Sequence, residues 1–429
     1  MKPLFLTAVA LLVCLLSCQK HNNPAPVTPT GPDTTTTTPS KIVDSTLAIN
    51  LTYSDATGAL GQGYELIISE AGGNILLDSV AAFNVPVAVT LKTKQPSVNV
   101  STVIFIPQFN TYTVNIFKAV QPAQWVEPTP GAKENLSYPN SFPAKITYLN
   151  VPPTSSNNVL FSDLPAPGGV EIAYVNGLTD PIQLNIGYPG RPNSDNYAYL
   201  LLSNLGQYSY HEIKTNNDTV DLSQMDNAVL VHFSKPSQYT MHLPYLYGYL
   251  DSTDFTKYQI LSVGGDPTAI ADLEYPPKNI VPVQNYLVYA DATTTSNESV
   301  SYSTFSDSVP TVLPSPTTPI YTLGATQNNS FSITFSQAPT LYSTIWSAGN
   351  TSVLIYAPPD STTQQPLNLI NSLKSKMLQG QSLSALKFAG INYSIAPSVD
   401  YNGYFNNQCD PVKAATKPLP ALMTYNKSF

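Results

Sequence analysis

The chain has 429 residues, a formal net charge of −8 and a single arginine, Arg191. Charged residues make up 11% of the sequence, against about 25% in typical soluble domains. Nucleic-acid binding needs clustered Lys and Arg side chains to neutralise phosphates, so this composition excludes nucleic acid as a partner. Abundant Thr, Ser, Asn and Tyr are instead typical of polar-faced β-sheet, and the length suits two or three domains at roughly 150 residues each.

The first residues follow the pattern of an export signal. Met1 and Lys2 give a positive start, and a mostly apolar run follows from Leu4 to Leu16. A membrane-spanning helix needs roughly 20 apolar residues, so this run is too short to span a bilayer. It fits the core of a cleaved signal peptide over residues 1–17.

The end of that run carries a candidate lipidation site. Leu15, Ser17 and Cys18 resemble the lipobox of bacterial lipoproteins. The resemblance implies that Cys18 is acylated, becomes the mature N-terminus and anchors the protein to a membrane through lipid. Gln19 is not the aspartate that retains enteric lipoproteins in the inner membrane, so the resemblance implies the outer membrane of a Bacteroidetes-type envelope. It leaves open whether the protein faces the periplasm or the cell surface.

Residues 18–41 are rich in Pro and Thr and have almost nothing to bury, which predicts a flexible tether. Cysteine usage adds a second constraint. Cys14 leaves with the signal peptide and Cys18 carries lipid, so Cys409 has no cysteine left to pair with inside the chain. The sequence contains no metal-binding or phosphate-binding motif, and we predict no cofactor and no metal.

Short runs with period-2 alternation follow the tether and predict an all-β fold of two or three β-sandwich domains, Ig-like or transthyretin-like. The first sandwich is expected over residues 42–127, where strands recur every 8 to 12 residues between turn signals. Its stretch from Gly58 to Val80 resembles the carboxypeptidase-regulatory-like, transthyretin-type sandwiches, which implies a support or binding module.

A Pro- and Gly-rich joint then leads to a second β-rich domain over residues 140–275. A third β-rich region is expected over 276–429, with the boundary near Pro276. This last region holds one predicted short helix near residues 366–379. Pro366 suits its first turn, its apolar residues share one face, and Gly380 lies at its end.

No catalytic motif is present. A nucleophile elbow of the form G-x-S-x-G is absent, so we expect no enzyme of that class. Carboxylate pairs converge in space rather than in sequence, so Asp251 with Asp254, or Asp272 with Glu274, keep a polysaccharide-acting hydrolase as an alternative.

Tyrosines alternate along several predicted strands, so each group shares one face of its strand. Together they could form an aromatic platform that stacks sugar rings, as glycan-binding sandwiches of bacteroidete outer membranes do. The alternative is that they are ordinary strand residues with buried rings. The candidate platform residues are Tyr245, Tyr247, Tyr249, Tyr197, Tyr199, Tyr208 and Tyr210.

Seven Asp-Ser/Thr tripeptides resemble the bacteroidete O-glycosylation acceptor. Asp-Ser and Asp-Thr also begin turns for reasons of their own, so the motif has two interpretations. The candidate acceptors are Thr34, Ser45, Ser79, Thr219, Ser252, Ser308 and Ser361.

These patterns favour a lipid-anchored envelope protein that acts as a non-catalytic binding or structural module, with polysaccharide or other envelope proteins as partners. Glycan capture is the first hypothesis. A fimbrial or adhesive surface subunit is the second, although such subunits are typically matured at an arginine near the N-terminus and Arg191 lies deep in the chain. A hydrolase is the third.

Overall fold

The structure, a computed structural model, describes most of the chain after residue 44, and residues 44–429 cluster as one compact unit. The predicted signal peptide and tether lie outside the described residues. The described ranges are 45–53, 60, 63–121, 123–127, 141–152, 159–162, 182–189, 197–203, 205–212, 215, 217–233, 237, 239–241, 244–250, 258–263, 271–277, 283–294, 298–312, 320–408 and 419–429.

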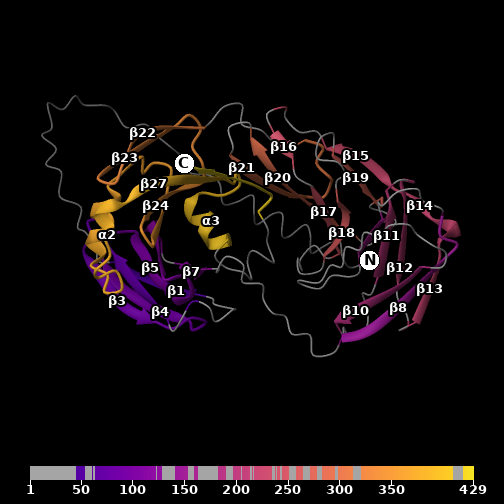
Figure 1. Cartoon of the computed structure of the whole chain (residues 1–429), viewed down its shortest axis with the longest axis horizontal. Coiled ribbons are helices and arrows are strands. Elements are labelled where there is room, and N and C mark those ends of the chain that lie inside the picture. The colour runs from indigo at the N-terminus through magenta and orange to yellow at the C-terminus, as the bar shows by residue number, and fades with distance from the viewer. Residues whose placement is uncertain are drawn as a thin grey trace, which may run out of the picture. The chain divides into compact units, whose positions relative to one another are not determined.

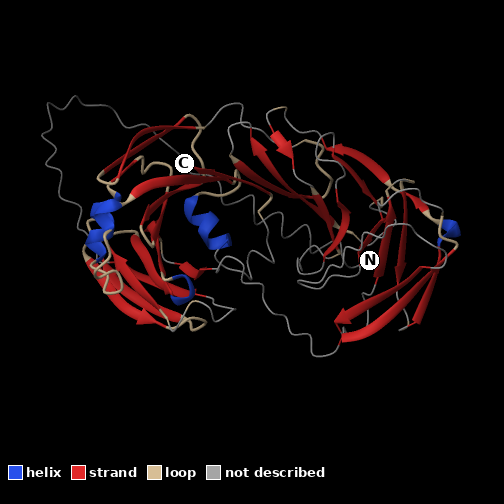
Figure 2. Ribbon diagram, viewed as in Figure 1, coloured by secondary structure: helices blue, strands red, loops and turns tan. Residues whose placement is uncertain are grey.

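Most of the described residues belong to β-strands (Figures 1 and 2). The largest sheet has thirteen strands. Its neighbours pair antiparallel except β25 and β6, which run parallel. In spatial order its strands are β18 (Tyr258–Val263), β17 (Tyr245–Tyr249), β20 (Asn285–Thr294), β21 (Ser299–Ser306), β28 (Ala421–Ser428), β27 (Lys387–Ile395), β24 (Leu341–Ala348), β25 (Thr351–Ala357), β6 (Thr111–Val120), β5 (Val98–Ile106), β2 (Tyr64–Ser69) and β3 (Ile75–Ala81), with β16 (Tyr239–Met241) paired to β20.

Five smaller sheets complete the described strands. Three of them have three strands; the first two of these are β4 (Val87–Thr93), β1 (Ser45–Tyr53) and β7 (Ala123–Glu127), and β10 (Ile182–Pro189), β8 (Ser141–Leu149) and β13 (Asn217–Asp221). One has four, β14 (Asp226–Asn227), β12 (Gln207–Glu212), β11 (Tyr197–Leu202) and β9 (Val159–Ser162). The others are β15 (Val229–Phe233) with β19 (Ala271–Tyr275), and β22 (Tyr321–Gln327), β23 (Ser330–Phe335) and β26 (Thr363–Gln364).

Strand β2 shows why the chain folds in layers, since all six of its residues are buried. Tyr64, Leu66 and Ile68 face one core, where they meet Tyr53 of β1 and Leu91 of β4. This core closes a sandwich between the sheet of β1, β4 and β7 and the large sheet. The other face of β2 contributes to a second, larger core, so both faces of the large sheet are covered at this point.

Two α-helices are described, α2 (Pro366–Leu373) and α3 (Tyr401–Gln408). Helix α2 begins at a proline and ends where Lys374 adopts a left-handed conformation with φ of 50°. The loop that follows is held by Glu65, a fully buried carboxylate. It accepts hydrogen bonds from the backbone N–H of Lys376 at 2.8 Å and of Met377 at 3.2 Å, and from the hydroxyl of Ser375.

The predicted all-β fold with a short helix near residues 366–379 is confirmed. The helix ends at Leu373, six residues before the predicted end at residue 379, because the following residues form the loop that Glu65 binds. Helix α3 was not predicted. The large sheet takes strands from all three predicted β regions, and the boundaries proposed at residues 127, 140 and 276 stay predictions. Within the part of the chain that the structure describes, no helix is both long and apolar enough to cross a membrane.

Candidate functional site: a tyrosine-bearing sheet face

Strands β17 and β20 bring predicted and unpredicted tyrosines to one side of the large sheet. Tyr245, Tyr247 and Tyr249 alternate along β17, so they project to the same side. In the register of the sheet, Tyr245 lies opposite Tyr289 of β20. Strand β18 pairs with the other edge of β17 and places Tyr258 opposite Tyr249. Figure 1 shows β17, β18, β20 and β21 side by side.

The opposite side of these strands is the core, which explains which side stays open. Leu246 and its cross-strand partner Val288 have no exposed surface, and Gly248, two residues further along β17, has no room for a side chain. A Cβ on Gly248 would come 2.5 Å from Leu261 Cδ1 and 3.0 Å from Val283 Cγ2. The tyrosines lie on the other side, where Tyr245, Tyr247, Tyr258 and Tyr289 are half-buried, and Tyr245 and Tyr247 also pack against residues of the large core.

The rings contact one another. The centroids of Tyr245 and Tyr247 lie 6.1 Å apart with the ring planes only 21° from parallel. Tyr258 meets Tyr247 edge-on, with centroids 5.6 Å apart. Tyr249, which is 7% exposed, packs beneath this group against Tyr258 and Phe305. Contacts of this kind fix the ring orientations, so the surface is preorganised.

A carboxylate lies at the end of this surface. Asp291 of β20 accepts a hydrogen bond from the Tyr289 hydroxyl at 2.7 Å and from the Ser301 hydroxyl at 2.8 Å, both through Oδ1. Asp291 is itself half-buried. We call Tyr245, Tyr247, Tyr258, Tyr289, Asp291 and Ser301 the tyrosine face.

Burial changes the acidity of these phenols. It raises the pKa of Tyr247 to about 12, and the neighbouring Tyr258, Tyr245 and Tyr289 act in the same direction. It also raises the pKa of Tyr258. Near neutral pH the hydroxyls therefore keep their protons and can donate as well as accept hydrogen bonds.

The second group of predicted platform tyrosines is arranged differently. Tyr199 of β11 and Tyr208 of β12 have no exposed surface, and their ring centroids lie 6.2 Å apart. Tyr210 is half-buried, and the side chain of Tyr197 is not among the described ones. Both fully buried rings belong to the large core. They are core residues and offer no surface for a ligand to stack on, which corrects their assignment to the platform.

The other candidate residues are scattered. Cys18, Thr34 and Ser252 lie outside the described residues, and the Ser45 side chain is not described. Ser79, Thr219 and Ser308 are exposed. Ser361 is half-buried and accepts a hydrogen bond from Lys118. Their glycosylation stays a prediction.

Of the acidic pairs, Asp251 and Asp254 lie outside the described residues, whereas Asp272 and Glu274 alternate on β19. Asp272 lies 2.7 Å from His232 Nδ1 on the neighbouring strand. Burial raises the pKa of Glu274. Among the residues that the structure describes, no group of three or more His, Cys, Asp or Glu side chains could hold a metal ion.

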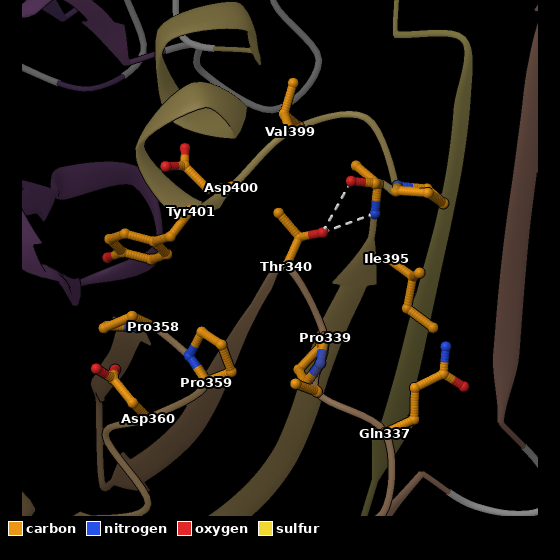
Figure 3. A pocket seen from close by; sticks show the side chains of 13 residues that line it. Gln337, Pro339, Thr340, Pro358, Pro359, Asp360, Ile395, Val399, Asp400 and Tyr401 are labelled. Atoms are coloured by element: carbon orange, nitrogen blue, oxygen red, sulfur yellow. Dashed lines mark hydrogen bonds between the residues drawn. The ribbon is translucent and has the colours of Figure 1, made fainter. Parts of the chain in front are cut away.

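A hollow of 530 Å³ opens elsewhere, beside the start of α3 (Figure 3). Prolines and the Tyr401 ring form much of its wall. Its polar groups serve the fold, since the Thr340 hydroxyl bonds to both the N–H and the carbonyl of Ala396. Asp400 accepts from the N–H of Gly403 at 2.7 Å in the first turn of α3. We assign no ligand to this hollow.

Sequence reasoning identified the β17 part of the tyrosine face and missed the rest. Tyr258, Tyr289, Asp291 and Ser301 come from three other strands, and only the pairing of those strands brings them together. The alternation of Tyr289 with Asp291 was a usable signal, because it places a phenol and a carboxylate on one face of a strand.

Comparison with known proteins adds little. No family model matches the chain, and no curated protein matches it. One solved structure, of a Ca²⁺-stabilized adhesin that helps an Antarctic bacterium bind ice, is 6% identical, with 81% of this chain and 94% of that chain covered. Its TM-score is 0.13, which is too low to support any argument about fold or function.

Proposed function

We propose that the protein is a lipid-anchored component of a bacterial outer-membrane envelope that captures glycan, without catalysis, on the tyrosine face. The observation that carries this proposal is the group of four half-buried tyrosines beside one carboxylate on a half-open sheet face.

The chemistry of the face suits a sugar. Aromatic rings offer a flat apolar surface against which the C–H side of a sugar ring can pack, and the phenol hydroxyls offer polar contacts at the rim. Asp291 accepts from two hydroxyls of the protein, and its second oxygen can accept from a hydroxyl of a glycan. Tyrosine side chains that neighbouring rings already hold in place lose little conformational entropy when a glycan binds.

The charge of the chain narrows the class of glycan. The formal charge is −8, and the one ionised group of the tyrosine face is a carboxylate. A polyanionic glycan would be repelled both by the net negative charge of the chain and by this carboxylate. We therefore expect neutral polysaccharides to bind and sulfated or uronate-rich ones to bind weakly.

Affinity electrophoresis tests this directly. The native protein is run through gels that contain neutral polysaccharides such as xylan, mannan, glucan or galactan, with an uronate-rich polymer for comparison. We expect retardation by at least one neutral polymer, and loss of retardation when Tyr245, Tyr247 and Tyr289 are replaced by alanine.

Tyr112→Ala is the matched control, because Tyr112 is also a half-buried strand tyrosine packed against a ring, that of Phe105 at 4.8 Å. It lies on β6, outside the tyrosine face. Unretarded migration of the native protein in every gel would contradict glycan capture, as would equal loss of retardation in the Tyr112 variant.

The anchor is tested separately. Replacing Cys18 with alanine removes the thiol that would carry lipid, so we expect the protein to move from the membrane fraction to the soluble fraction. Persistence of the Cys18→Ala variant in the membrane fraction would contradict the lipid anchor while leaving glycan capture untouched.

A further inference from the structure

A serine and a lysine that lie 243 positions apart in the sequence meet in a cavity outside the tyrosine face. The Nζ of Lys118 lies 2.6 Å from the Oγ of Ser361, and both residues line a cavity of 650 Å³. We infer that Ser361 and Lys118 form a nucleophile–base pair that hydrolyses uncharged acyl esters. A hydroxyl and an amine at this distance are within reach for proton transfer, and a Ser–Lys pair is a known alternative to the Ser–His–Asp arrangement.

The backbone of β6 departs from regular geometry where it presents the lysine. Two residues of β6, Lys118 and Ala119, oppose the single residue Asn99 of β5, which makes a β-bulge. Ala119 has a positive φ of 56°, a strained conformation for a residue with a Cβ. Its N–H is bonded to Asn99 Oδ1 at 3.2 Å. Bulges of this kind redirect a side chain and recur beside active sites.

Two tyrosine hydroxyls hold the main chain of the pair. The hydroxyl of Tyr401 donates to the carbonyl of Lys118 at 2.6 Å. The hydroxyl of Tyr342, a fully buried side chain, donates to the carbonyl of Ser361. Nucleophile and base are thus each fixed from a different element, which keeps the 2.6 Å contact in place.

The serine side of the pair rests on a buried hydrogen-bond network. Gln364 Nε2 donates to the Tyr342 hydroxyl at 2.7 Å, and Gln364 Oε1 accepts from Thr344 at 3.3 Å. Thr344 in turn accepts from the indole N–H of Trp346 at 2.9 Å. A buried network that is satisfied in this way gives the site rigidity.

The surroundings increase the neutral fraction of the Lys118 amine. Burial lowers the pKa of Lys118, and the carboxylate of Asp360 opposes that shift. Lys118 and Asp360 are the two charged residues that line the cavity. A lysine with a lowered pKa has a larger neutral fraction, which is the form that can accept a proton. The exposed Asp360 also disfavours an anionic substrate, hence the choice of uncharged esters.

The reaction balances with water as the only co-reactant. Neutral Lys118 Nζ takes the hydroxyl proton of Ser361 as Oγ bonds to the ester carbonyl carbon. The tetrahedral intermediate then expels the alcohol oxygen, which takes that proton from the Lys118 ammonium and leaves an acyl-serine. Water gives a proton to Nζ as its oxygen attacks the acyl carbon, and Oγ recovers the proton when the carboxylic acid leaves.

The cavity also offers hydrogen-bond donors for the oxyanion of that intermediate. Four carboxamide side chains line it, Asn99, Gln364, Gln365 and Asn368. Gln364 and Asn368 already donate to the Tyr342 hydroxyl and to Gln365 Oε1. The N–H groups of Asn99 and Gln365 are therefore the ones assigned to a developing negative charge on a carbonyl oxygen.

This inference does not rest on glycan capture, because the two sites share no residue. The test uses the purified full-length protein with p-nitrophenyl acetate and p-nitrophenyl butyrate. We expect a burst of nitrophenol, and, after an acid quench, a peptide that carries one acyl group on Ser361 in the mass spectrum. Ser361→Ala, Lys118→Met and Lys118→Arg should each lower the rate at least about 100-fold. Arginine keeps the charge but cannot release a proton at assay pH.

A second serine–lysine pair, on the large sheet, gives the matched control. Ser347 and Lys387 are exposed cross-strand neighbours on β24 and β27. Ser347→Ala and Lys387→Met should leave the rate unchanged, and thermal melting checks that every variant is folded.

The pH profile separates a base from a structural lysine. The native rate should rise with pH as Lys118 loses its proton. Asp360→Asn should move this rise to lower pH, because it removes the carboxylate that raises the pKa of Lys118. No ester hydrolysis by the native protein, hydrolysis that survives in the Ser361 and Lys118 variants, or a profile that Asp360→Asn does not move would each overturn the inference.

Discussion

Two groups of alternating tyrosines have the same sequence pattern and opposite surroundings. In β11 and β12, Tyr199 and Tyr208 are fully buried in the large core. In β17 and β20, Tyr245 and Tyr289 stand opposite each other on a half-open face. The period of two determines that tyrosines share a face, whereas the strands packed on that face determine whether a ligand can reach them.

The largest effect should come from the buried group. Tyr199→Ala removes a ring with no exposed surface, so it should lower the free energy of unfolding by about 3–5 kcal/mol. Urea denaturation followed by circular dichroism measures the loss. A loss below about 1 kcal/mol would mean that the ring is not part of the core, and the contrast between the two groups would fail.

Gly248→Ala probes the covered side of the tyrosine face. The new Cβ would lie 2.5 Å from Leu261 Cδ1, so overpacking should cost about 1–3 kcal/mol. The same urea titration gives the value. If Gly248→Ala left the free energy of unfolding unchanged, this side of β17 would have room for a side chain, and tight packing there could not explain why the tyrosines lie on the other side.

Tyr247→Ala should lower the stability less than the two preceding substitutions, but it should abolish glycan binding. The ring is half-buried, so we expect a loss of about 1–2 kcal/mol. Retardation in neutral-polysaccharide gels should nevertheless disappear, whereas Tyr247→Phe, which keeps the ring, should retain most of it. Retardation that Tyr247→Ala leaves intact would remove this residue from the proposed site.

Alkaline pH should destabilise the fold in part through the tyrosine face. The pKa of Tyr247 is raised from 10.0 to about 12 in the folded protein. The stability linked to this shift is therefore complete below pH 10 and is lost as the pH rises towards 12. Tyr247→Phe should flatten the decline of the melting temperature over this interval. An unchanged slope would mean that Tyr247 ionises as easily as in the unfolded chain.

Asp291→Asn should give the smallest change in stability. It keeps the shape of the side chain and an acceptor for Tyr289 and Ser301, so we expect a loss below about 1 kcal/mol. Binding of a neutral glycan should weaken several-fold, since one charged acceptor is lost. Tighter binding by Asp291→Asn would indicate an anionic ligand and would contradict the choice of neutral glycans.

The sequence predicted the fold class and helix α2 because both depend on local periodicity. Helix α3 escaped detection because the segment Tyr401–Gln408 has little amphipathic pattern. Asp400 caps its first turn, and the ring contact of Phe405 with Phe117 attaches it to β6. Such contacts lie far apart in the sequence, and a local pattern does not contain them.

The same limit applies to the sites. Alternation along β17 identified three tyrosines, but the pairing of β17 with β18 and β20 supplied Tyr258 and Tyr289. Lys118 and Ser361 have no shared motif, and they meet only because β6 pairs in parallel with β25 and the chain after β25 returns to the same cavity.

The most direct test of the central claim compares the two tyrosine groups in one experiment. With ring-labelled tyrosine and assignments from single Tyr→Phe variants, NMR spectra are recorded as a neutral oligosaccharide from a retarding polymer is added. We predict saturable shifts for Tyr245, Tyr247, Tyr258 and Tyr289, and none for Tyr199 and Tyr208. Unchanged resonances on the tyrosine face, or shifts confined to the buried pair, would contradict glycan capture at this site.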